Sequence, residues 1–196
     1  MIISGHWQGA NLACAYNDRG NAKEVKGDFD GAIADYTKGI ALKPDYANVY
    51  YNRGIAFGQK GLYDRSIADF TKAITLIPDN AKAYHNRGFA YKLKGLYDSA
   101  IADYTQVIAL NPDSAKAYSR RAWAYHEKGE DGIGLSDAEK AIVLVPDDAE
   151  NFELRAEIFE KVGQRDNAVA DYRAALKLDP KLKVAGDNLK RLDAAP

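Results

Sequence analysis

The sequence predicts an all-α chain built from five copies of a 34-residue helix–turn–helix repeat, followed by one further helix. The stretch YNRGIAFGQKGLYD at residues 51–64 returns almost unchanged as HNRGFAYKLKGLYD at residues 85–98. Five of the six prolines follow the same interval: Pro44, Pro78, Pro112, Pro146 and Pro180. A fixed period of this length is typical of an architecture in which each repeat is one supersecondary unit.

Each repeat is expected to hold two antiparallel helices. In the second half of a repeat, for example DRSIADFTKAITLI at residues 64–77, apolar residues recur at steps of three and four, which is helical periodicity. A glycine after a lysine-rich turn suits the left-handed end of the first helix. These glycines are Gly27, Gly61, Gly95, Gly129 and Gly163.

Two further columns support this interpretation. A small residue in the middle of the first helix lets the neighbouring helix approach closely. That column holds Gly20, Gly54, Gly88, Ala122 and Ala156. An aromatic column precedes it at Tyr16, Tyr50, Tyr84, Tyr118 and Phe152.

Together these columns closely resemble the tetratricopeptide repeat (TPR) over about residues 13–180. The resemblance implies a right-handed α-solenoid in which the first helices line a concave groove, closed by a capping helix that covers the last apolar face. The expected parts are a lead-in at 1–12, repeats at 13–46, 47–80, 81–114, 115–148 and 149–180, and the capping helix and tail at 181–196.

Two repeats depart from the pattern. Repeat 4 carries Gly132 and Gly134 early in its second helix, and Ala138 where the other repeats have a ring. Helical glycines cost about 1 kcal/mol each relative to alanine, so we expect repeat 4 to be the least stable. In repeat 1, Lys23 replaces an aromatic residue, which indicates a solvent-facing or truncated edge.

Composition excludes several classes of function. Among 196 residues the net charge is −1, so the chain lacks the basic excess of a nucleic-acid or anionic-membrane surface. One cysteine, Cys14, and three histidines give no metal-ligand spacing, and we expect no cofactor.

No apolar run approaches the about 20 residues that span a bilayer. The start lacks the basic region of a secretory signal, which predicts a cytoplasmic protein. A longer gene product with an upstream targeting segment, periplasmic or secreted, is the alternative.

Two charged columns are complete. They are Arg19, Arg53, Arg87, Arg121 and Arg155, and Asp35, Asp69, Asp103, Asp137 and Asp171. An arginine ladder could bind an acidic ligand, but a guanidinium beside a close helix contact must be paired, so we predict a structural ion-pair ladder. The expected pairs join Arg53, Arg87, Arg121 and Arg155 to Asp35, Asp69, Asp103 and Asp137 across the seam between repeats; pairing within a repeat, as in Arg53 with Asp69, is the alternative.

Nothing in the sequence indicates catalysis. The carboxylates recur once per repeat, as in a scaffold and not as in a single active site. His85 and His126 have no serine or cysteine at a spacing that suggests a nucleophile–base pair.

The residues that vary between repeats are expected to face a ligand. Those on the first helices, predicted to form a peptide-binding groove, are Asn17, Asn21, Asn48, Tyr51, Asn52, Ile55, Lys82, His85, Asn86, Phe89, Lys116, Ser119, Arg120 and Trp123. Amides, rings and cations in one groove suit an extended peptide, with the cations of Lys82, Lys116 and Arg120 taking an acidic group. The last repeat turns acidic with Glu150, Glu153 and Glu157.

Some TPR domains that bind heat-shock chaperones hold a peptide's C-terminal carboxylate with five Lys, Asn and Arg positions. Three of the five match here in each of two registers: first Asn21, Asn52 and Lys82, then Asn86, Lys116 and Arg120. The resemblance therefore implies a non-catalytic module that binds a protein or peptide, with an acidic or C-terminal carboxylate group as one option for the bound group. We expect a monomer or a weak homo-oligomer. A self-associating scaffold and an accessory segment of an enzyme complex are the alternatives.

Overall fold

The computed structural model of the chain describes residues 3–193, which form eleven α-helices and, in that range, no strand. The helices are α1 (Ile3–Val25), α2 (Phe29–Leu42), α3 (Ala47–Gln59), α4 (Tyr63–Leu76), α5 (Ala81–Leu93), α6 (Tyr97–Leu110), α7 (Ala115–Lys128), α8 (Asp131–Leu144), α9 (Ala149–Lys161), α10 (Arg165–Leu178) and α11 (Lys183–Asp193). From Ile3 on, the predicted lead-in is the start of α1, while residues 1–2 and 194–196 lie outside the described range.

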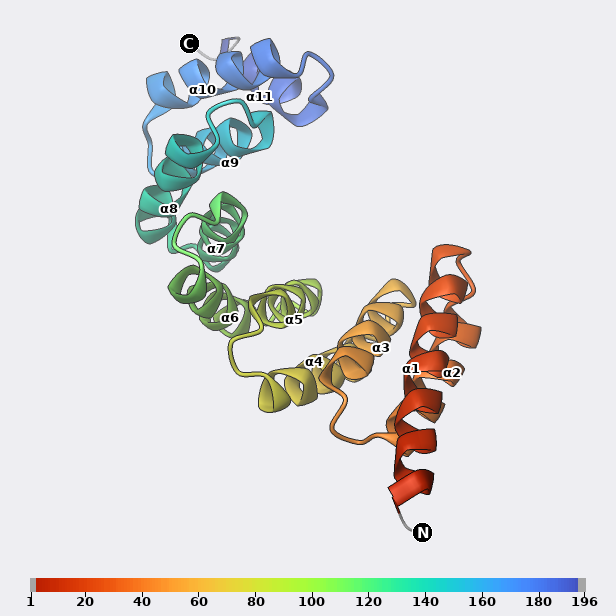
Figure 1. The fold of residues 1–196 in the computed structure, drawn as a ribbon. Helices are drawn as coiled ribbons and strands as arrows, with labels where there is room; N and C mark the ends of the chain where they lie inside the picture. The colour runs from red at the N-terminus through yellow and green to blue at the C-terminus, as the bar shows by residue number, and fades with distance from the viewer. Residues whose placement is uncertain (1–2, 194–196) are drawn as a thin grey trace. The chain divides into compact units, whose positions relative to one another are not determined.

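The helices, whose order along the chain can be followed by colour in Figure 1, fall into two compact units. Unit 1 ends at Leu96 and holds α1 to α5; unit 2 begins at Tyr97 and holds α6 to α11. Helices pair in sequence order, α1 with α2 and α3 with α4 in unit 1, and α7 with α8 and α9 with α10 in unit 2. The division falls inside the predicted third repeat, between its first helix α5 and its second helix α6.

Glycine shapes the turns and the closest helix contacts as predicted. All five turn glycines have a positive φ of 71° to 78°, the left-handed conformation that other residues adopt only with strain. A Cβ built on Gly54 would lie 2.9 Å from Cε1 of Phe70, and one on Gly20 would lie 2.5 Å from Cε1 of Tyr36. The aromatic ring of the second helix therefore packs directly on the backbone of the first.

In unit 1 the core lies at the seams between repeats. Ala32 and Tyr36 of α2 pack with Val49 and Ala56 of α3, and a second cluster joins α4 to α5. Because the contact residues are mostly alanine, the helices approach closely, and even a small change in side-chain volume is expected to disturb their packing.

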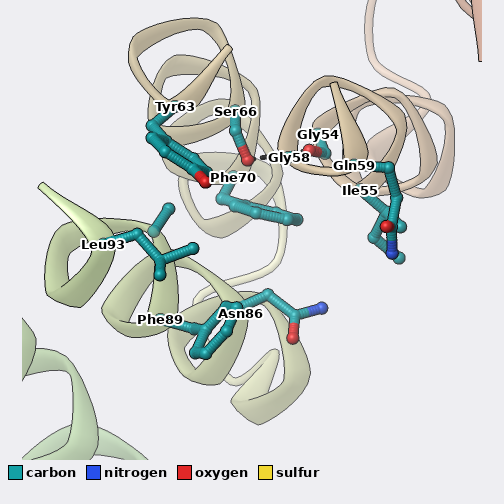
Figure 2. A pocket seen from close by; sticks show the side chains of 11 residues that line it. Gly54, Ile55, Gly58, Gln59, Tyr63, Ser66, Phe70, Asn86, Phe89 and Leu93 are labelled. Atoms are coloured by element: carbon teal, nitrogen blue, oxygen red, sulfur yellow. Dashed lines mark hydrogen bonds between the residues drawn. The ribbon is translucent and has the colours of Figure 1, made fainter. Parts of the chain in front are cut away.

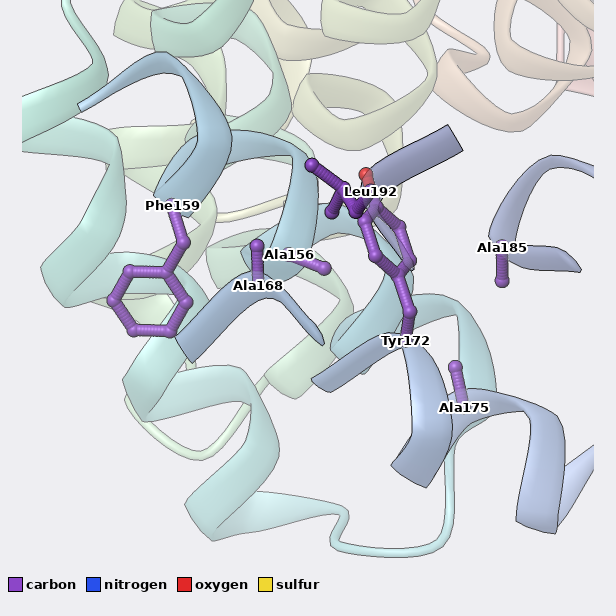
Figure 3. Packing of buried hydrophobic residues seen from close by; sticks show 7 residues of the cluster. All are labelled: Ala156, Phe159, Ala168, Tyr172, Ala175, Ala185 and Leu192. Carbon is purple, nitrogen blue, oxygen red and sulfur yellow. The ribbon is translucent and has the colours of Figure 1, made fainter. Parts of the chain in front are cut away.

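In unit 2 the largest buried cluster joins α9, α10 and the capping helix (Figure 3). Its members are Ala156, Phe159, Ala168, Tyr172, Ala175, Ala185 and Leu192. Ala185 and Leu192 come from α11, and the Glu153 carboxylate accepts the Ala185 N–H at 2.8 Å. The segment predicted to cap the array thus buries one face against α9 and α10.

Repeat 4 keeps its helix despite the two glycines. Gly132 is exposed, with nothing within 4 Å of a Cβ built there. Gly134 is buried, and its Cβ would lie 3.0 Å from the carbonyl oxygen of Ala122. An alanine at position 134 therefore has little room for its methyl group, whereas position 132 has that room.

Candidate functional site

The arginine column pairs with aspartate inside each repeat. Arg53 donates from Nε and Nη2 to Asp69 at 2.7 and 2.9 Å, and Arg121 donates in the same way to Asp137 at 2.6 and 2.8 Å. Equivalent two-bond pairs join Arg19 to Asp35 and Arg155 to Asp171. The predicted pairing across the seam is not observed at these positions, and the alternative within a repeat is.

The packing of glycine on the ring explains this choice of partner. Arg53 precedes Gly54 and Asp69 precedes Phe70, so the contact of Gly54 with Phe70 places the two charges side by side. The guanidinium of Arg53 also lies 5.8 and 5.6 Å from the ring centroids of Tyr50 and Phe57. The copied aromatic column thus flanks the cation and belongs to the scaffold.

A hydroxyl group carries the link across the seam. The third arginine nitrogen, Nη1, donates to a threonine on the second helix of the preceding repeat, at 2.9 to 3.0 Å. These links are Arg53 to Thr37, Arg87 to Thr71 and Arg121 to Thr105. The copied charges are therefore used inside the protein and are not offered to a ligand.

In the first repeat, Lys23 occupies the position that holds an aromatic ring in the other repeats, and it forms an ion pair there. Lys23 Nζ lies 2.9 Å from the Asp35 carboxylate, which also binds Arg19. The hydrogen bond from Arg19, helped by Lys23, holds the pKa of Asp35 far below its usual range. Lys23 thus takes part in the ion pairing of repeat 1.

Three predicted groove amides of unit 1 bind one another. Asn52 donates one amide hydrogen to Asn17 at 2.9 Å and the other to Asn21 at 3.0 Å. The Asn21 side-chain oxygen also lies 2.8 Å from the Tyr36 hydroxyl oxygen, and Asn17 is buried. Because both N–H groups of Asn52 are committed, this amide has no donor left for a carboxylate, and the first clamp register loses a central member.

The α5 face of unit 1 is more accessible. Asn86 donates to the Tyr51 hydroxyl at 3.0 Å and keeps its second N–H, while burial raises the pKa of Tyr51. Lys82 is exposed and has no hydrogen bond or ion pair to any described residue. His85, which lies between Lys82 and Asn86 in the sequence of α5, is half-buried.

A pocket opens between α3, α4 and α5 (Figure 2). Its volume is about 260 Å³, and it is lined by Gly54, Ile55, Gly58, Gln59, Tyr63, Ser66, Phe70, Asn86, Phe89, Ala90 and Leu93. No lining residue is charged. Phe89 and Leu93, one helical turn apart on α5, are 39% and 45% exposed.

In unit 2 the predicted groove residues lie on α7. Lys116 is exposed and has no described partner, whereas Ser119, Arg120 and Trp123 are half-buried. The Trp123 ring meets the Tyr97 ring edge to face, with centroids 5.8 Å apart. The clamp members Lys116 and Arg120 thus lie on one helix face, as their spacing of four residues predicts.

The acidic end of unit 2 surrounds a second, polar pocket. It is lined by His126, Glu127, Glu157, Glu160, Lys161, Tyr172, Asn188 and Arg191. Glu160 accepts from the Tyr172 hydroxyl at 2.6 Å and from Arg191 at 2.5 Å, and His126 Nδ1 lies 2.5 Å from Asp131. Burial, together with Glu153 nearby, raises the pKa of Glu157.

The described residues hold no group of three or more His, Cys, Asp or Glu side chains placed to bind a metal ion. Within the same range, no helix has both the length and the apolar character required to cross a membrane.

Comparison with known families decides the classification. Family models described as TPR repeat and tetratricopeptide repeat match residues 20–61, 47–80, 81–114 and 149–182, which is more than half of the chain. The chain belongs to the tetratricopeptide repeat family. The all-α class and the solenoid of TPR units predicted from the sequence are thereby confirmed.

Solved structures agree with the TPR assignment. A crystal structure of MamA protein is 30% identical, with a TM-score of 0.81 over 87% of this chain and 93% of that chain. MamA from Desulfovibrio magneticus RS-1 is 20% identical, with a TM-score of 0.83 over 88% and 97%. YrrB, described as a TPR protein with an unusual peptide-binding site, is 19% identical, with a TM-score of 0.80 over 89% and 90%. The last two share the fold alone, and no curated protein matches the chain.

TPR arrays generally serve as non-catalytic scaffolds for protein interaction, and membership of this family makes the chain a protein-interaction module.

Sequence reasoning missed the pocket of unit 1. The signal was available at one column, which reads Glu24, Gly58, Lys92, His126 and Glu160. Only the second repeat has no side chain there. A glycine such as Gly58, at a position where the other repeats have large and varied side chains, can indicate a hollow and not only a turn.

Proposed function

We propose that this TPR chain binds a peptide segment of a partner protein on the faces of its first helices, without catalysis and without a cofactor. The supporting observation is a contrast between two sets of charges. The copied arginines described above are held by aspartate within the same repeat, whereas Lys82 on α5 and Lys116 on α7 are exposed and have no described partner. Charges that the scaffold does not use are available to a ligand.

The ligand chemistry follows from these side chains. In each unit, an exposed ammonium group without a described partner favours an acidic segment or a terminal carboxylate, since charge-assisted hydrogen bonds are the strong ones. Asn86, with its second N–H available beside the Tyr51 hydroxyl, can hold the peptide backbone. YrrB, which shares the fold, is described as having a peptide-binding site, which supports a peptide over a folded partner.

Panning a display library of random peptides against the whole chain tests the proposal. We expect soluble binders whose affinity falls as salt rises, because exposed charges are screened over about 10 Å at 0.1 M salt. Lys82→Ala should weaken binders of acidic sequence, and Lys26→Ala, an exposed lysine outside the first-helix faces, is the matched control. Failure to enrich any peptide, or equal losses in the two variants, would refute the proposal.

A further inference from the structure

The pocket of unit 1 exists because two positions change together. In repeat 1, the Tyr36 hydroxyl donates to Glu24 at 2.8 Å, and in repeat 5 the Tyr172 hydroxyl donates to Glu160 at 2.6 Å. In each pair the glutamate precedes the tyrosine by 12 residues. Repeats 1 and 5 thus fill this space in the same way, with a buried phenol and a carboxylate that accepts its hydrogen bond.

Repeat 2 has Phe70 and Gly58 at these two positions. The Phe70 ring occupies the same place as Tyr36, because each packs on the small-column glycine of its repeat. Phe70 has no hydroxyl group, so no acceptor is needed, and Gly58 offers no side chain. The space that a glutamate fills in repeats 1 and 5 is left open, and both residues line the pocket (Figure 2).

The lining indicates what the pocket can bind. Ile55, Phe70, Phe89 and Leu93 give the pocket its apolar lining, and Gln59, Tyr63, Ser66 and Asn86 add amide and hydroxyl groups. No acidic lining residue is present to hold a cation, and no basic one to hold an anion. The volume of about 260 Å³ is below the about 300–1,000 Å³ usual for drug-sized ligands. It suits a single large side chain.

The exposed part of the pocket wall is supplied by repeat 3, and its residues differ from those at the same positions of the other repeats. Leu93 stands where the other repeats have Val25, Gln59, Glu127 and Lys161, so it is not a copied scaffold residue. Every charged residue of α5 is cationic. Lys82 is exposed, and the Lys92 ammonium lies 6.0 Å from the Phe89 ring centroid. Charge complementarity therefore favours acidic residues on either side of the apolar one.

We propose that this pocket receives one bulky apolar side chain, leucine, isoleucine, methionine or phenylalanine, from a partner segment with acidic residues beside it. The inference rests on the proposed function and adds the anchor residue and its place. The apolar side chain would bury itself against Phe70 and Ile55, while Lys82 and Lys92 meet the flanking carboxylates.

Filling the pocket tests the inference. Gly58→Leu places a side chain in the space, and its Cβ would lie 3.4 Å from Ser66 Oγ, an ordinary contact. The double variant Gly58→Glu with Phe70→Tyr installs the pair that repeats 1 and 5 already use. Gly132→Leu makes the same glycine-to-leucine change at an exposed helical site and is the matched control.

Peptides selected on the wild-type chain are the probes, and fluorescence anisotropy measures their Kd. Burial of one large apolar side chain predicts a loss of about 10- to 100-fold in both pocket variants, and a similar loss when the shared apolar residue of the peptide becomes alanine. Gly132→Leu should leave the Kd unchanged. Circular dichroism and thermal unfolding check that the variants fold.

Leu93→Ser supplies a second variant that does not enter the core, because Leu93 is an exposed residue of the pocket wall. It should weaken the same peptides, and methyl resonances of Ile55 should move when the peptide saturates the wild-type chain. If the pocket variants and Leu93→Ser bind the peptides as tightly as the wild type, the pocket is not the anchor site, although the proposed function stands. If no peptide binds the wild-type chain, the proposed function fails and this inference fails with it.

Discussion

Replacing Arg121 by alanine should be among the most damaging single changes in unit 2. Asp137 is only 6% exposed, and it accepts two hydrogen bonds from Arg121 at 2.6 and 2.8 Å. The hydrogen bond to Asp137 raises the pKa of Arg121, so the guanidinium is charged at every usable pH. Removing it strands a buried carboxylate and also breaks the link to Thr105.

The expected cost follows from this geometry. Breaking a buried ion pair by removing one partner costs about 3–5 kcal/mol. The Arg121 side chain is 18% exposed, so water can reach part of the gap, and we expect about 3 kcal/mol. For a chain of this length that lowers Tm by about 6–12 °C, measurable by circular dichroism.

Arg19→Ala is the matched control. Arg19 makes the same two bonds to Asp35, but its side chain is 57% exposed, and Asp35 keeps Lys23 at 2.9 Å. The loss in Tm should therefore be much smaller than for Arg121→Ala. Adding Asp137→Asn to Arg121→Ala should recover part of the loss, because no charge is then stranded. Equal losses in the two single variants would refute the stranded-charge account.

Four further predictions concern repeats 4 and 5. Gly132→Ala should stabilise the chain by about 1 kcal/mol in urea unfolding, and Gly134→Ala should not, because its Cβ would press on a carbonyl oxygen. Amide hydrogen exchange, measured by mass spectrometry, should be faster in α8 than in α4. Glu157→Gln should raise Tm at neutral pH, since the raised pKa of the carboxyl shows that its charge is unfavourable there, and the gain should vanish below about pH 4. Lys116→Ala with Arg120→Ala should weaken acidic peptides in anisotropy with little change in Tm.

Each of these has a result that contradicts it. Stabilisation by Gly134→Ala would mean that the α7 backbone yields easily. Equal protection of α8 and α4 would remove the argument that repeat 4 is weak. A Glu157→Gln gain that persists in acid would point to packing instead of charge, and unchanged affinity of the double variant would leave those two cations a role in solubility alone.

The repeat, its helices and its turn glycines could be predicted from the sequence because each depends on local chemistry that recurs. The ion pairs were harder, since Asp69 is a plausible partner for Arg53 and Asp35 is equally plausible from the sequence. The contact of Gly54 with Phe70 decides between them, and that contact is itself a sequence signal with the same spacing. Asn17 was predicted to face a ligand, yet it is buried, because side chains of three helical positions converge in a way that a column cannot show.

The short reach of the arginine–aspartate pairs has a consequence for how the chain folds. Each pair joins residues 16 apart, and none of the side-chain hydrogen bonds described above spans more than 35 residues. Such a chain pays little loop-closure entropy before its contacts form, which favours fast folding that can start in any repeat. On the ribosome, one repeat could form its own ion pair as soon as its second helix emerged. The arginine of the next repeat would then form its hydrogen bond to the threonine of that folded repeat.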